Sequence, residues 1–318
     1  MDKKRILITG ITGFIGSELA RELCDEYEVV GLVRTSSNQD NLKIIQDVLP
    51  KIKIVYGNFT DFPAIRMIVK NIEPHYIIHV GGATAVRHSF ENPIEFGAVN
   101  YLGTVNLVHA ALEVSCFKKF LFASTMETYG YQDEKVPFKE DVSKLEPDSP
   151  YAVSKIAAEK YIEMISKSSD FPHVILKCCN TFGRKHNSGF IVEYLITNML
   201  KGETIYIGTP EAVRDLMYVT DHVKAYITAM KSDVKEGKFN FSTGEHMTMW
   251  ELAKKIKELT GFTGDIVRGF PPNYPSRPQT AQYLAMDASK AGDLLGWKPE
   301  FSIEEGLKKT IEYWKGKV

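Results

Sequence analysis

Apolar runs of five or six residues alternate with longer amphipathic segments through the first half of the chain. The runs predict strands at residues 5–9, 28–33, 52–56, 76–80, 119–123 and 174–178. The amphipathic segments predict helices at residues 17–26, 64–70, 100–113 and 151–166. Strands that alternate with helices form a parallel sheet with helices on both faces. The pattern therefore predicts an α/β fold, a doubly wound parallel sheet, over residues 1–175.

The second half of the chain is less regular. Helical periodicity returns at residues 191–202, 249–261 and 303–315, and a proline-rich stretch predicts a loop at residues 269–278. No low-complexity linker separates the halves, so we expect two domains that pack tightly and share a cleft. Residues 176–318 are assigned mainly to a smaller mixed α/β domain, with a segment near residues 212–242 returning to the first domain.

Charge and length exclude several classes of function. Lys and Arg number 39 and Asp and Glu number 40, which gives a formal net charge of −1. This balance argues against nucleic acid bound by a general basic surface, and against a polybasic membrane anchor. No apolar stretch approaches the roughly 18–20 residues of a spanning helix, and the first residues lack the apolar core of a signal peptide. We therefore expect neither nucleic acid nor a membrane as a partner.

The cysteines and histidines show no metal-binding pattern. The four cysteines are Cys24, Cys116, Cys178 and Cys179, and none has C-x-x-C spacing. Neither a zinc site nor a disulfide framework is indicated, and the histidines have no convincing ligand spacing. These features predict a soluble, reduced, cytoplasmic protein without a metal.

A glycine-rich turn follows the first predicted strand and opens the first predicted helix. Its residues are Gly10, Thr12, Gly13, Phe14, Ile15 and Gly16, with the glycines spaced G-x-x-G-x-x-G. Glycines at such a junction permit a tight turn and let backbone N–H groups approach a pyrophosphate at the helix N-terminus. The context predicts a dinucleotide-binding turn in a Rossmann-type fold, against the alternative of a glycine-rich turn without a ligand.

The residues after the second predicted strand bear on the choice of cofactor. A carboxylate at this place accepts hydrogen bonds from the adenosine ribose, whereas an arginine accommodates a 2′-phosphate. The chain has Arg34 followed by hydroxyl side chains, and no carboxylate before Asp40. This favours NADP, while NAD stays possible and Arg34 has the alternative of being an exposed arginine in a polar loop.

Tyr151 and Lys155 form a second motif. They lie four residues apart on a predicted helix and so share one face. A tyrosine with a reference pKa near 10 needs a nearby cation to act as a base at neutral pH, and Lys155 can supply it. This spacing also arises by chance on helix surfaces. Here it follows a dinucleotide-type turn and a strand that ends in Ser124 and Thr125, which favours catalysis.

Taken together, these motifs resemble an extended short-chain dehydrogenase/reductase of the NAD-dependent epimerase/dehydratase family, whose members modify nucleotide sugars. The similarity runs through nearly the whole chain. It includes TGITGFIG, YIIHVGGA, the N-x-x-G-T segment at residues 100–104 and SPYAVSK. It also includes the R-D-x-x-x-V-x-D segment at residues 214–221 and the tail at residues 287–297. GDP-mannose 4,6-dehydratases and UDP-glucose 4-epimerases are the members that the chain resembles.

The resemblance implies roles for individual residues. Thr125, Tyr151 and Lys155 would form the catalytic triad: Thr125 would bind the sugar 4-oxygen, Tyr151 would take its proton, and Lys155 would tune Tyr151 and hold the nicotinamide ribose. The implied cofactor contacts also include Asn58, Phe59, Val80 and Gly81. The implied contacts to the diphosphate of a nucleoside-diphosphate sugar are Asn180, Arg214 and Arg277, which places the substrate in the second domain.

Glu127 distinguishes reactions within the family. Oxidation at C4 can be followed by re-reduction from the other face, as in a 4-epimerase, or by loss of water across C5 and C6, as in a 4,6-dehydratase. The family's dehydratases carry a glutamate at this place as the C5 base, so Glu127 favours dehydration, although Met126 leaves the acid role of the glucose-type enzymes unfilled. If residues 125–127 are extended, Thr125 and Glu127 point to the same side and Met126 faces away. A structural carboxylate is the alternative for Glu127.

Three further functions compete with dehydration. The first is a 4-epimerase, and the second is a reductase of 4-keto-6-deoxy sugars. A non-catalytic NADP sensor is disfavoured because Tyr151 and Lys155 are both present.

The resemblance also implies a homodimer, formed through the helices at residues 100–113 and 151–166 as a four-helix bundle. Their apolar residues, which include Leu107, Val108, Ile156 and Ile162, could equally serve the core of one chain.

Overall fold

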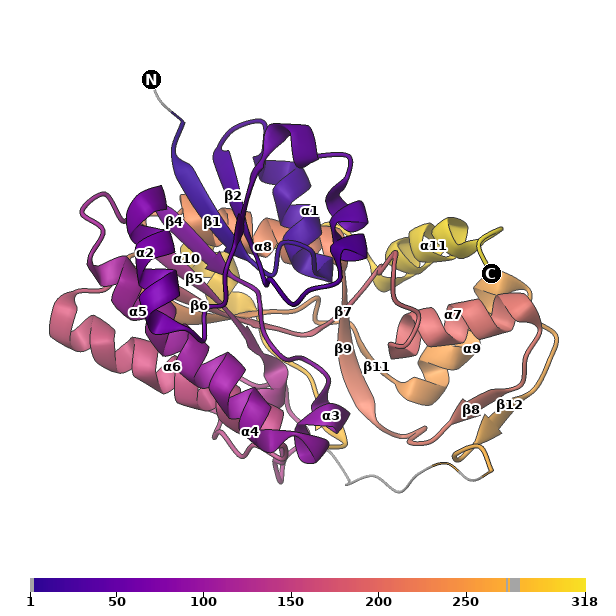
Figure 1. The fold of residues 1–318 in the computed structure, drawn as a ribbon. Coiled ribbons are helices and arrows are strands. Elements are labelled where there is room, and N and C mark those ends of the chain that lie inside the picture. Colours follow the sequence, from indigo (N-terminus) through magenta and orange to yellow (C-terminus); the bar gives the residue numbers. More distant parts are fainter. Residues whose placement is uncertain (1–2, 273, 275–280) are drawn as a thin grey trace.

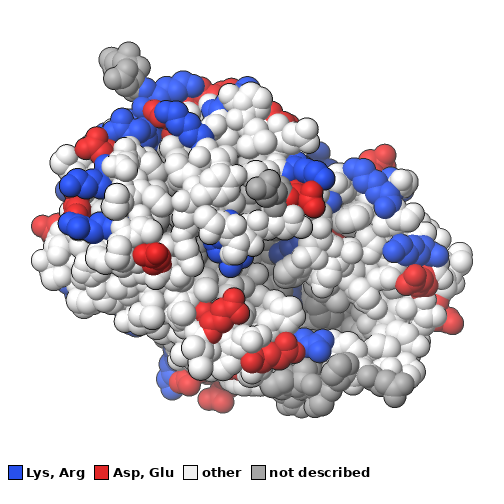
Figure 2. Space-filling model, viewed as in Figure 1, with Lys and Arg blue, Asp and Glu red and all other residues white. Residues whose placement is uncertain are grey.

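A computed structural model describes residues 3–272, 274 and 281–318 of the chain. Figure 1 shows a large helix-flanked sheet, with a smaller part beside it that carries α7, α9 and α11. The surface is hollowed between these two parts (Figure 2). On the same face, Lys and Arg side chains are interspersed with Asp and Glu, and no single extended basic area dominates.

The large sheet has seven parallel strands, which confirms the predicted Rossmann-type fold. Its strand order is β10-β6-β5-β4-β1-β2-β3. The chain moves outward from β1 through β2 to β3, and then crosses back to place β4 on the other side of β1. The connections that leave the carboxyl ends of β1 and β4 therefore run in opposite directions, and open α/β sheets bind ligands at such a switch point. The strands are β1 (Arg5–Thr9), β2 (Glu28–Val33), β3 (Lys53–Tyr56), β4 (Tyr76–His79), β5 (Lys119–Thr125), β6 (His173–Cys178) and β10 (Glu236–Phe241).

Helices cover both faces of this sheet because its strands are apolar on both sides. In β1, Ile6 and Ile8 enter one core cluster and Leu7 enters the other. The first cluster lies under α1 and α8, and the second lies under α2, α5 and α6, which stack along one side in Figure 1. These helices are α1 (Phe14–Leu23), α2 (Phe62–Ile72), α5 (Gly103–Leu112), α6 (Pro150–Ser169) and α8 (Val219–Lys231).

The segment before α5 differs from its prediction as one helix over residues 100–113. A π-helical stretch, Gly97–Leu102, precedes α5 and follows two short helices, α3 (Val86–Glu91) and α4 (Pro93–Phe96). Asn100 lies in this stretch, and its side chain is used for tertiary hydrogen bonds rather than for the helix surface. Short 3-10 helices occur at Gln39–Ile45, Leu49–Lys51 and Met126–Thr128.

The smaller part has a core of its own, built by helices and short strands. Capping boxes at Thr248–Glu251 and Ser302–Glu305 begin two of its helices. Its helices are α7 (Ile191–Lys201), α9 (Met249–Thr260) and α11 (Ile303–Trp314). Its strands are β7 (Asn180–Phe182), β8 (Ile205–Ile207), β9 (Val213–Tyr218), β11 (His246–Thr248), β12 (Ile266–Arg268) and β13 (Tyr283–Leu284). Between β9 and β11 the chain returns to the large sheet as α8 and β10, and α10 (Ser289–Leu295) packs near β10.

Candidate active site

The turn between β1 and α1 packs so closely against neighbouring backbone that it requires glycine at two positions. Gly10 has a φ of +68°, and a Cβ there would lie 2.7 Å from the Cα of Gly81 at the end of β4. A Cβ on Gly16 would lie 2.1 Å from the carbonyl oxygen of Gly10. Both contacts are too short for a side chain, so the two glycines let β1, β4 and α1 meet at the switch point.

The start of α1 is suited to an anion. Gly13 is its N-cap residue and is exposed, and the first turn has neither a side-chain cap nor an acidic residue. Its backbone N–H groups are therefore left for a ligand, and the helix dipole favours a negative charge at this end. Thr12, Phe14 and Ile15 are half-buried around the same turn. These features fit the pyrophosphate of a dinucleotide.

The other predicted cofactor residues lie at the ends of neighbouring strands. Arg34 follows β2 and is exposed, and within the described part of the chain its side chain has no ion pair or hydrogen bond. Asn58, after β3, is exposed and accepts a hydrogen bond from the Thr60 backbone. Phe59 is buried, with its ring 5.1 Å from the His79 ring. Val80 and Gly81 are half-buried after β4.

A buried hydrogen-bond chain holds the loop after β4 in place. The Gly81 N–H donates to Thr9 Oγ1 at 3.0 Å, and Thr9 is bonded to His79 Nδ1 at 2.7 Å. His79 Nε2 reaches Thr104 Oγ1 at 3.1 Å. Burial, together with the Lys155 charge, lowers the pKa of His79 to about 3. His79 is therefore a neutral structural residue. Its hydrogen bonds to Thr9 and Thr104 were not predicted, because these partners are distant from it in the sequence.

The catalytic helix candidate, α6, starts with Ser149 as N-cap and Pro150 in the first turn. Ser149 Oγ accepts from the Ala152 N–H at 3.3 Å. This start places Tyr151 and Lys155 in the first two turns, where both are buried. Asn100 ties the helix to the loop after β4, because its Nδ2 donates to Ser154 Oγ at 3.0 Å and to the Ala83 carbonyl at 3.0 Å. The structure thus joins the cofactor turn to the catalytic helix.

Burial shifts the two candidate catalytic groups in opposite directions. It raises the pKa of Tyr151, an effect strengthened by the Glu127 charge and opposed by a hydrogen bond with Thr125. Burial lowers the pKa of Lys155 to about 8, and the Glu159 carboxylate opposes this. Lys155 Nζ donates to the Ala123 carbonyl at 2.8 Å.

The end of β5 differs from the predicted extended conformation. The strand ends at Thr125, and the chain turns into the 3-10 helix Met126–Thr128 because Thr125 Oγ1 accepts a hydrogen bond from the Glu127 N–H at 3.2 Å. The prediction that alternation along an extended strand places Thr125 and Glu127 on one side is therefore wrong. Met126 is fully buried in the core.

Glu127 nevertheless lies in the same electrostatic environment as Tyr151. Burial raises its pKa, the Arg214 charge lowers it, and the Asp148 charge raises it. Asp148 was not singled out from the sequence. It lies three residues before Tyr151, and its Oδ2 accepts from the Ala281 N–H at 2.5 Å. The only local signal was its position beside the N-cap of α6, so a second carboxylate near Glu127 is a result of the tertiary structure.

The described residues that were predicted to contact the substrate diphosphate lie in the smaller part of the molecule. Asn180 begins β7, which pairs with β9, and Arg214 lies on β9. The Arg214 guanidinium donates to the carbonyl oxygens of Val213 at 2.8 Å and Ala281 at 2.9 Å. The Arg214 charge also lowers the pKa of Glu127, so the structure brings Arg214 within electrostatic range of the carboxyl group that follows β5. Arg277 lies outside the described residues.

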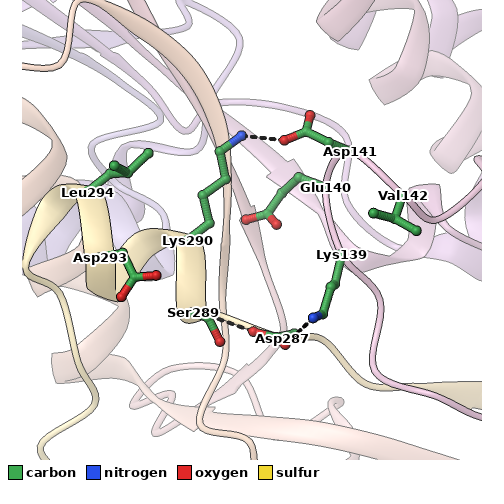
Figure 3. A pocket seen from close by; sticks show the side chains of 9 residues that line it. All are labelled: Lys139, Glu140, Asp141, Val142, Asp287, Ser289, Lys290, Asp293 and Leu294. Atoms are coloured by element: carbon green, nitrogen blue, oxygen red, sulfur yellow. Dashed lines mark hydrogen bonds and ion pairs between the residues drawn. The ribbon is translucent and has the colours of Figure 1, made fainter.

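A separate cavity of about 380 Å³ contains none of these residues (Figure 3). It lies between the segment after β5 and α10. Its charged side chains pair with one another, since Lys290 lies 2.7 Å from Asp141 and Lys139 lies 3.4 Å from Asp287. This cavity does not belong to the candidate site.

Within residues 3–272, 274 and 281–318, no helix is long and apolar enough to cross a membrane. The same residues contain no group of three or more His, Cys, Asp or Glu side chains placed to hold a metal ion. All four cysteines are free thiols.

Comparison with known proteins gives consistent matches over almost the entire chain. The family model described as GDP-mannose 4,6 dehydratase matches residues 7–310. The dTDP-D-glucose 4,6-dehydratase of Bos taurus is 30% identical over 98% of this chain and 89% of its own length. The crystal structure of a UDP-glucose 4-epimerase with UDP-glucose, from Thermotoga maritima, has a TM-score of 0.88 and 30% identity, and covers 98% of this chain and 99% of that one.

A further solved structure contains NAD. The UDP-glucose 4-epimerase of Thermus thermophilus in complex with NAD has a TM-score of 0.85 and 28% identity, and covers 99% of this chain and 100% of that one. Both kinds of relative, dehydratase and epimerase, are enzymes that act on nucleotide sugars. With the glycine turn at the switch point and Tyr151 and Lys155 on α6, these matches show that the chain is an enzyme of the NAD-dependent epimerase/dehydratase family.

Proposed function

We propose that this protein is a nucleotide-sugar 4,6-dehydratase. The observation that carries the proposal is Glu127, a carboxyl group at the end of β5 that lies close enough to Tyr151 to raise the pKa of the phenol. A C4 epimerase needs the triad but no additional carboxylate, whereas a dehydratase needs a base for the C5 proton.

The first step is oxidation of the sugar at C4. Thr125, which is hydrogen-bonded to Tyr151, orients the 4-hydroxyl, and Tyr151 accepts its proton. Lys155 stabilises the phenolate that Tyr151 must form, because a nearby cation favours the charged form of a tyrosine. The glycine turn would hold a nicotinamide cofactor, which when bound would accept the hydride that leaves C4.

The second step is elimination of water from the 4-keto sugar. The carbonyl at C4 acidifies the C5 proton, and Glu127 removes it. The raised pKa of Glu127 makes this carboxylate a stronger base than an exposed glutamate. The C6 hydroxyl leaves with a proton, which Met126 cannot supply, so we assign that proton to water or to Tyr151. Elimination leaves a double bond between C5 and C6. Return of the hydride to C6 and of a proton to C5, the latter from Glu127, would give the 4-keto-6-deoxy sugar and balance the oxidation at C4.

The diphosphate of the substrate is assigned to the smaller part of the molecule. Arg214 on β9 carries a guanidinium, which can grip phosphate oxygens through two parallel hydrogen bonds. Asn180 on the adjacent β7 completes the described set, and Arg277 is proposed from the resemblance alone. The substrate would thus be a nucleoside-diphosphate sugar whose sugar reaches Tyr151 and Glu127.

NADP is the proposed cofactor. Arg34 supports it, since it is exposed after β2 and is bound to no other described side chain. Replacing Arg34 with Ala should weaken NADP binding by about 1.5–3 kcal/mol, the value of a charged hydrogen bond, and leave NAD binding little changed. Titration calorimetry with both dinucleotides measures the difference. Equal losses, or a protein purified with NAD alone, would identify NAD as the cofactor.

A second candidate, UDP-hexose 4-epimerisation, is favoured by a specific observation. The Thermotoga maritima structure, at 30% identity and a TM-score of 0.88, is a UDP-glucose 4-epimerase. Incubation with a panel of nucleotide sugars in heavy water, with products identified by NMR, separates the two functions. A dehydratase yields a 4-keto-6-deoxy sugar and exchanges C5 hydrogen with solvent, and Glu127→Gln should stop that exchange while transient cofactor reduction persists. An inverted, unlabelled sugar would reject the dehydratase.

We also propose that two copies associate through α5 and α6. The apolar residues predicted for this face, Leu107, Val108 and Ile162, are fully buried within one chain, and Ile156 is half-buried. Other apolar residues of the same helices are exposed, including Val153 at 53% and Met164 at 48%. A second copy would cover them.

A further inference from the structure

A buried ion pair lies behind the catalytic residues and is not used in the steps above. Glu159 on α6 and Lys177 on β6 are 1% and 0% exposed, and their charged atoms are 3.0 Å apart. Burying two charges is costly, and a buried pair often contributes little net stability. A gain in overall stability is therefore a weak reason for burying this pair behind the candidate catalytic residues.

Hydrogen bonds connect the ion pair to the end of β5 at two positions. Ser124 Oγ donates to the Glu159 carboxylate. Lys177 Nζ donates to Thr128 Oγ1 at 2.6 Å, and Thr128 Oγ1 in turn donates to the Thr125 carbonyl at 2.8 Å. Ser124 and Thr128 flank the segment that presents Thr125 and Glu127. The pair thus connects α6, β6 and both ends of this segment.

Glu159 also continues the series that begins at Tyr151 and Lys155. The three residues are spaced by four, so they lie on one face of α6, one turn apart. Burial lowers the pKa of Lys155, whereas the Glu159 carboxylate raises it. Lys155 Nζ also lies 4.9 Å from the centroid of the Phe122 ring, and its charge acts on His79, which is neutral.

Other charged groups near the pair are few. Lys238 on β10 and Glu163 on α6 act on Lys177 with opposite signs. Tyr129 places its ring 4.7 Å from Lys177 Nζ, and burial raises the pKa of its hydroxyl, so it is neutral. Among the described groups that act on Lys155, Glu159 is the only one whose charge favours the ammonium form.

We propose that Glu159 and Lys177 are positioning residues for catalysis: the pair locks the end of β5 to α6, and its carboxylate serves as the buried counter-charge of Lys155. Lys177 orients the Glu159 carboxylate through the 3.0 Å ion pair, and the Glu159 charge favours the ammonium form of Lys155 beside Tyr151. This inference rests on the proposed function only in assigning Tyr151 and Lys155 to C4 oxidation, a step that dehydratases and epimerases share.

The test removes both charges together. Glu159→Gln with Lys177→Met leaves no unpaired buried charge, a replacement that proteins often tolerate. Without the Glu159 charge, Lys155 should lose its proton at lower pH, so the alkaline limb of kcat for C4 oxidation should move down by about 0.5–1 pH unit. Lys177→Arg retains a positive charge that can pair with Glu159, so the alkaline limb of kcat in this variant should stay at the wild-type pH. Lys167→Met, an exposed charge two turns after Glu159 on α6, is the control and should change nothing.

A second readout does not depend on turnover. In protein labelled with ¹⁵N-lysine, the Nζ shift of Lys155 followed against pH should show the same downward change in the double variant. A folded double variant with an unshifted alkaline limb and an unshifted Lys155 titration would overturn the proposal, and a loss of thermal stability alone would show a purely structural role. If the products show an epimerase, the dehydratase assignment fails while this test still applies.

Discussion

Tyr151 and Lys155 are neighbours on α6, and the burial they share weakens each of their charged forms. Lys155, with its pKa lowered to about 8, holds its proton at neutral pH but begins to lose it in mildly alkaline solution. Tyr151 resists ionisation even more strongly, because its pKa is raised. Catalysis through Tyr151 therefore depends on a charged Lys155, and activity should fall as pH rises above about 8.

Replacing Tyr151 with Phe tests the proton acceptor. The ring keeps its edge contact with Phe96, whose centroid lies 6.2 Å away, so the fold and cofactor binding should persist. Turnover should fall by about 10²–10⁴-fold, the usual contribution of a positioned acid or base. Steady-state kinetics and cofactor titration measure the two effects. Tyr161→Phe, which removes from the same helix a hydroxyl that is hydrogen-bonded to His109 of α5, is the control. Near-normal turnover in the Tyr151 variant would remove Tyr151 from the mechanism.

Asp148→Asn tests the coupling between the two carboxyl groups. The asparagine Oδ1 can still accept from the Ala281 N–H, but the negative charge that raises the pKa of Glu127 is gone. The pKa of Glu127 should fall. Since Glu127 must be ionised to act as a base, the acid limb of the dehydration rate should move to lower pH, by about half a unit. Rates measured as a function of pH on the acid side show the shift. Glu146→Gln, an exposed acid nearby, should leave the limb in place; an unchanged limb in the Asp148 variant would argue against Glu127 as the base.

At the scale of elements, the site is assembled where β1, β4 and β5 end and α1 and α6 begin. Gly81 approaches Gly10, and Asn100 connects the loop after β4 to α6. The turn into a 3-10 helix after Thr125 decides where Glu127 points. The proposed site therefore depends on junctions between elements as well as on the first turns of α6.

Gly16→Ala tests the closest of these junctions. The new methyl group would lie 2.1 Å from the Gly10 carbonyl oxygen, so α1 must move away from the turn. Overpacking of this kind costs about 1–3 kcal/mol, and the displaced N–H groups should bind the dinucleotide roughly ten-fold more weakly or worse. Thermal unfolding and dinucleotide titration measure both effects. Gly97→Ala is the matched control, because its Cβ would meet no atom within 4 Å. Wild-type affinity in the Gly16 variant would contradict a role for the tight turn.

At the scale of the whole molecule, two parts built by separate cores enclose one hollow. The large sheet provides the glycine turn and α6, and the smaller part provides Asn180 and Arg214. The chain crosses between them several times, through α8 and β10, so neither half of the sequence forms the site alone. This arrangement would couple the proposed diphosphate contacts to α6.

The proposed dimer is a prediction at this scale. Light scattering at micromolar concentration should give about twice 35.9 kDa. Val153→Glu combined with Met164→Glu places two charges on the exposed face of α6 and should yield a monomer, because an apolar interface excludes unpaired charge. Leu294→Glu, an equally exposed leucine on α10, should leave the mass unchanged. A monomeric wild-type chain would reject the proposal.

The sequence alone determined the sheet, the glycine turn and the spacing of Tyr151 and Lys155, because strand periodicity, turn chemistry and helix spacing are local properties. Resemblance to a known family placed Glu127 near the reaction. The prediction that residues 125–127 are extended was incorrect. A hydrogen bond from the Glu127 N–H to Thr125 ends the strand there, and strand boundaries depend on such individual bonds.

Only the tertiary structure decided which distant groups meet. Asp148 near Glu127, Glu159 against Lys177 and His79 between Thr9 and Thr104 join residues that are 18 to 70 positions apart. No local pattern encodes these contacts, since they arise when parallel strands end at one edge and helices cross over them. The ionisation of the site depends on these same contacts, because burial and neighbouring charge, rather than residue type alone, shift the pKa of a group.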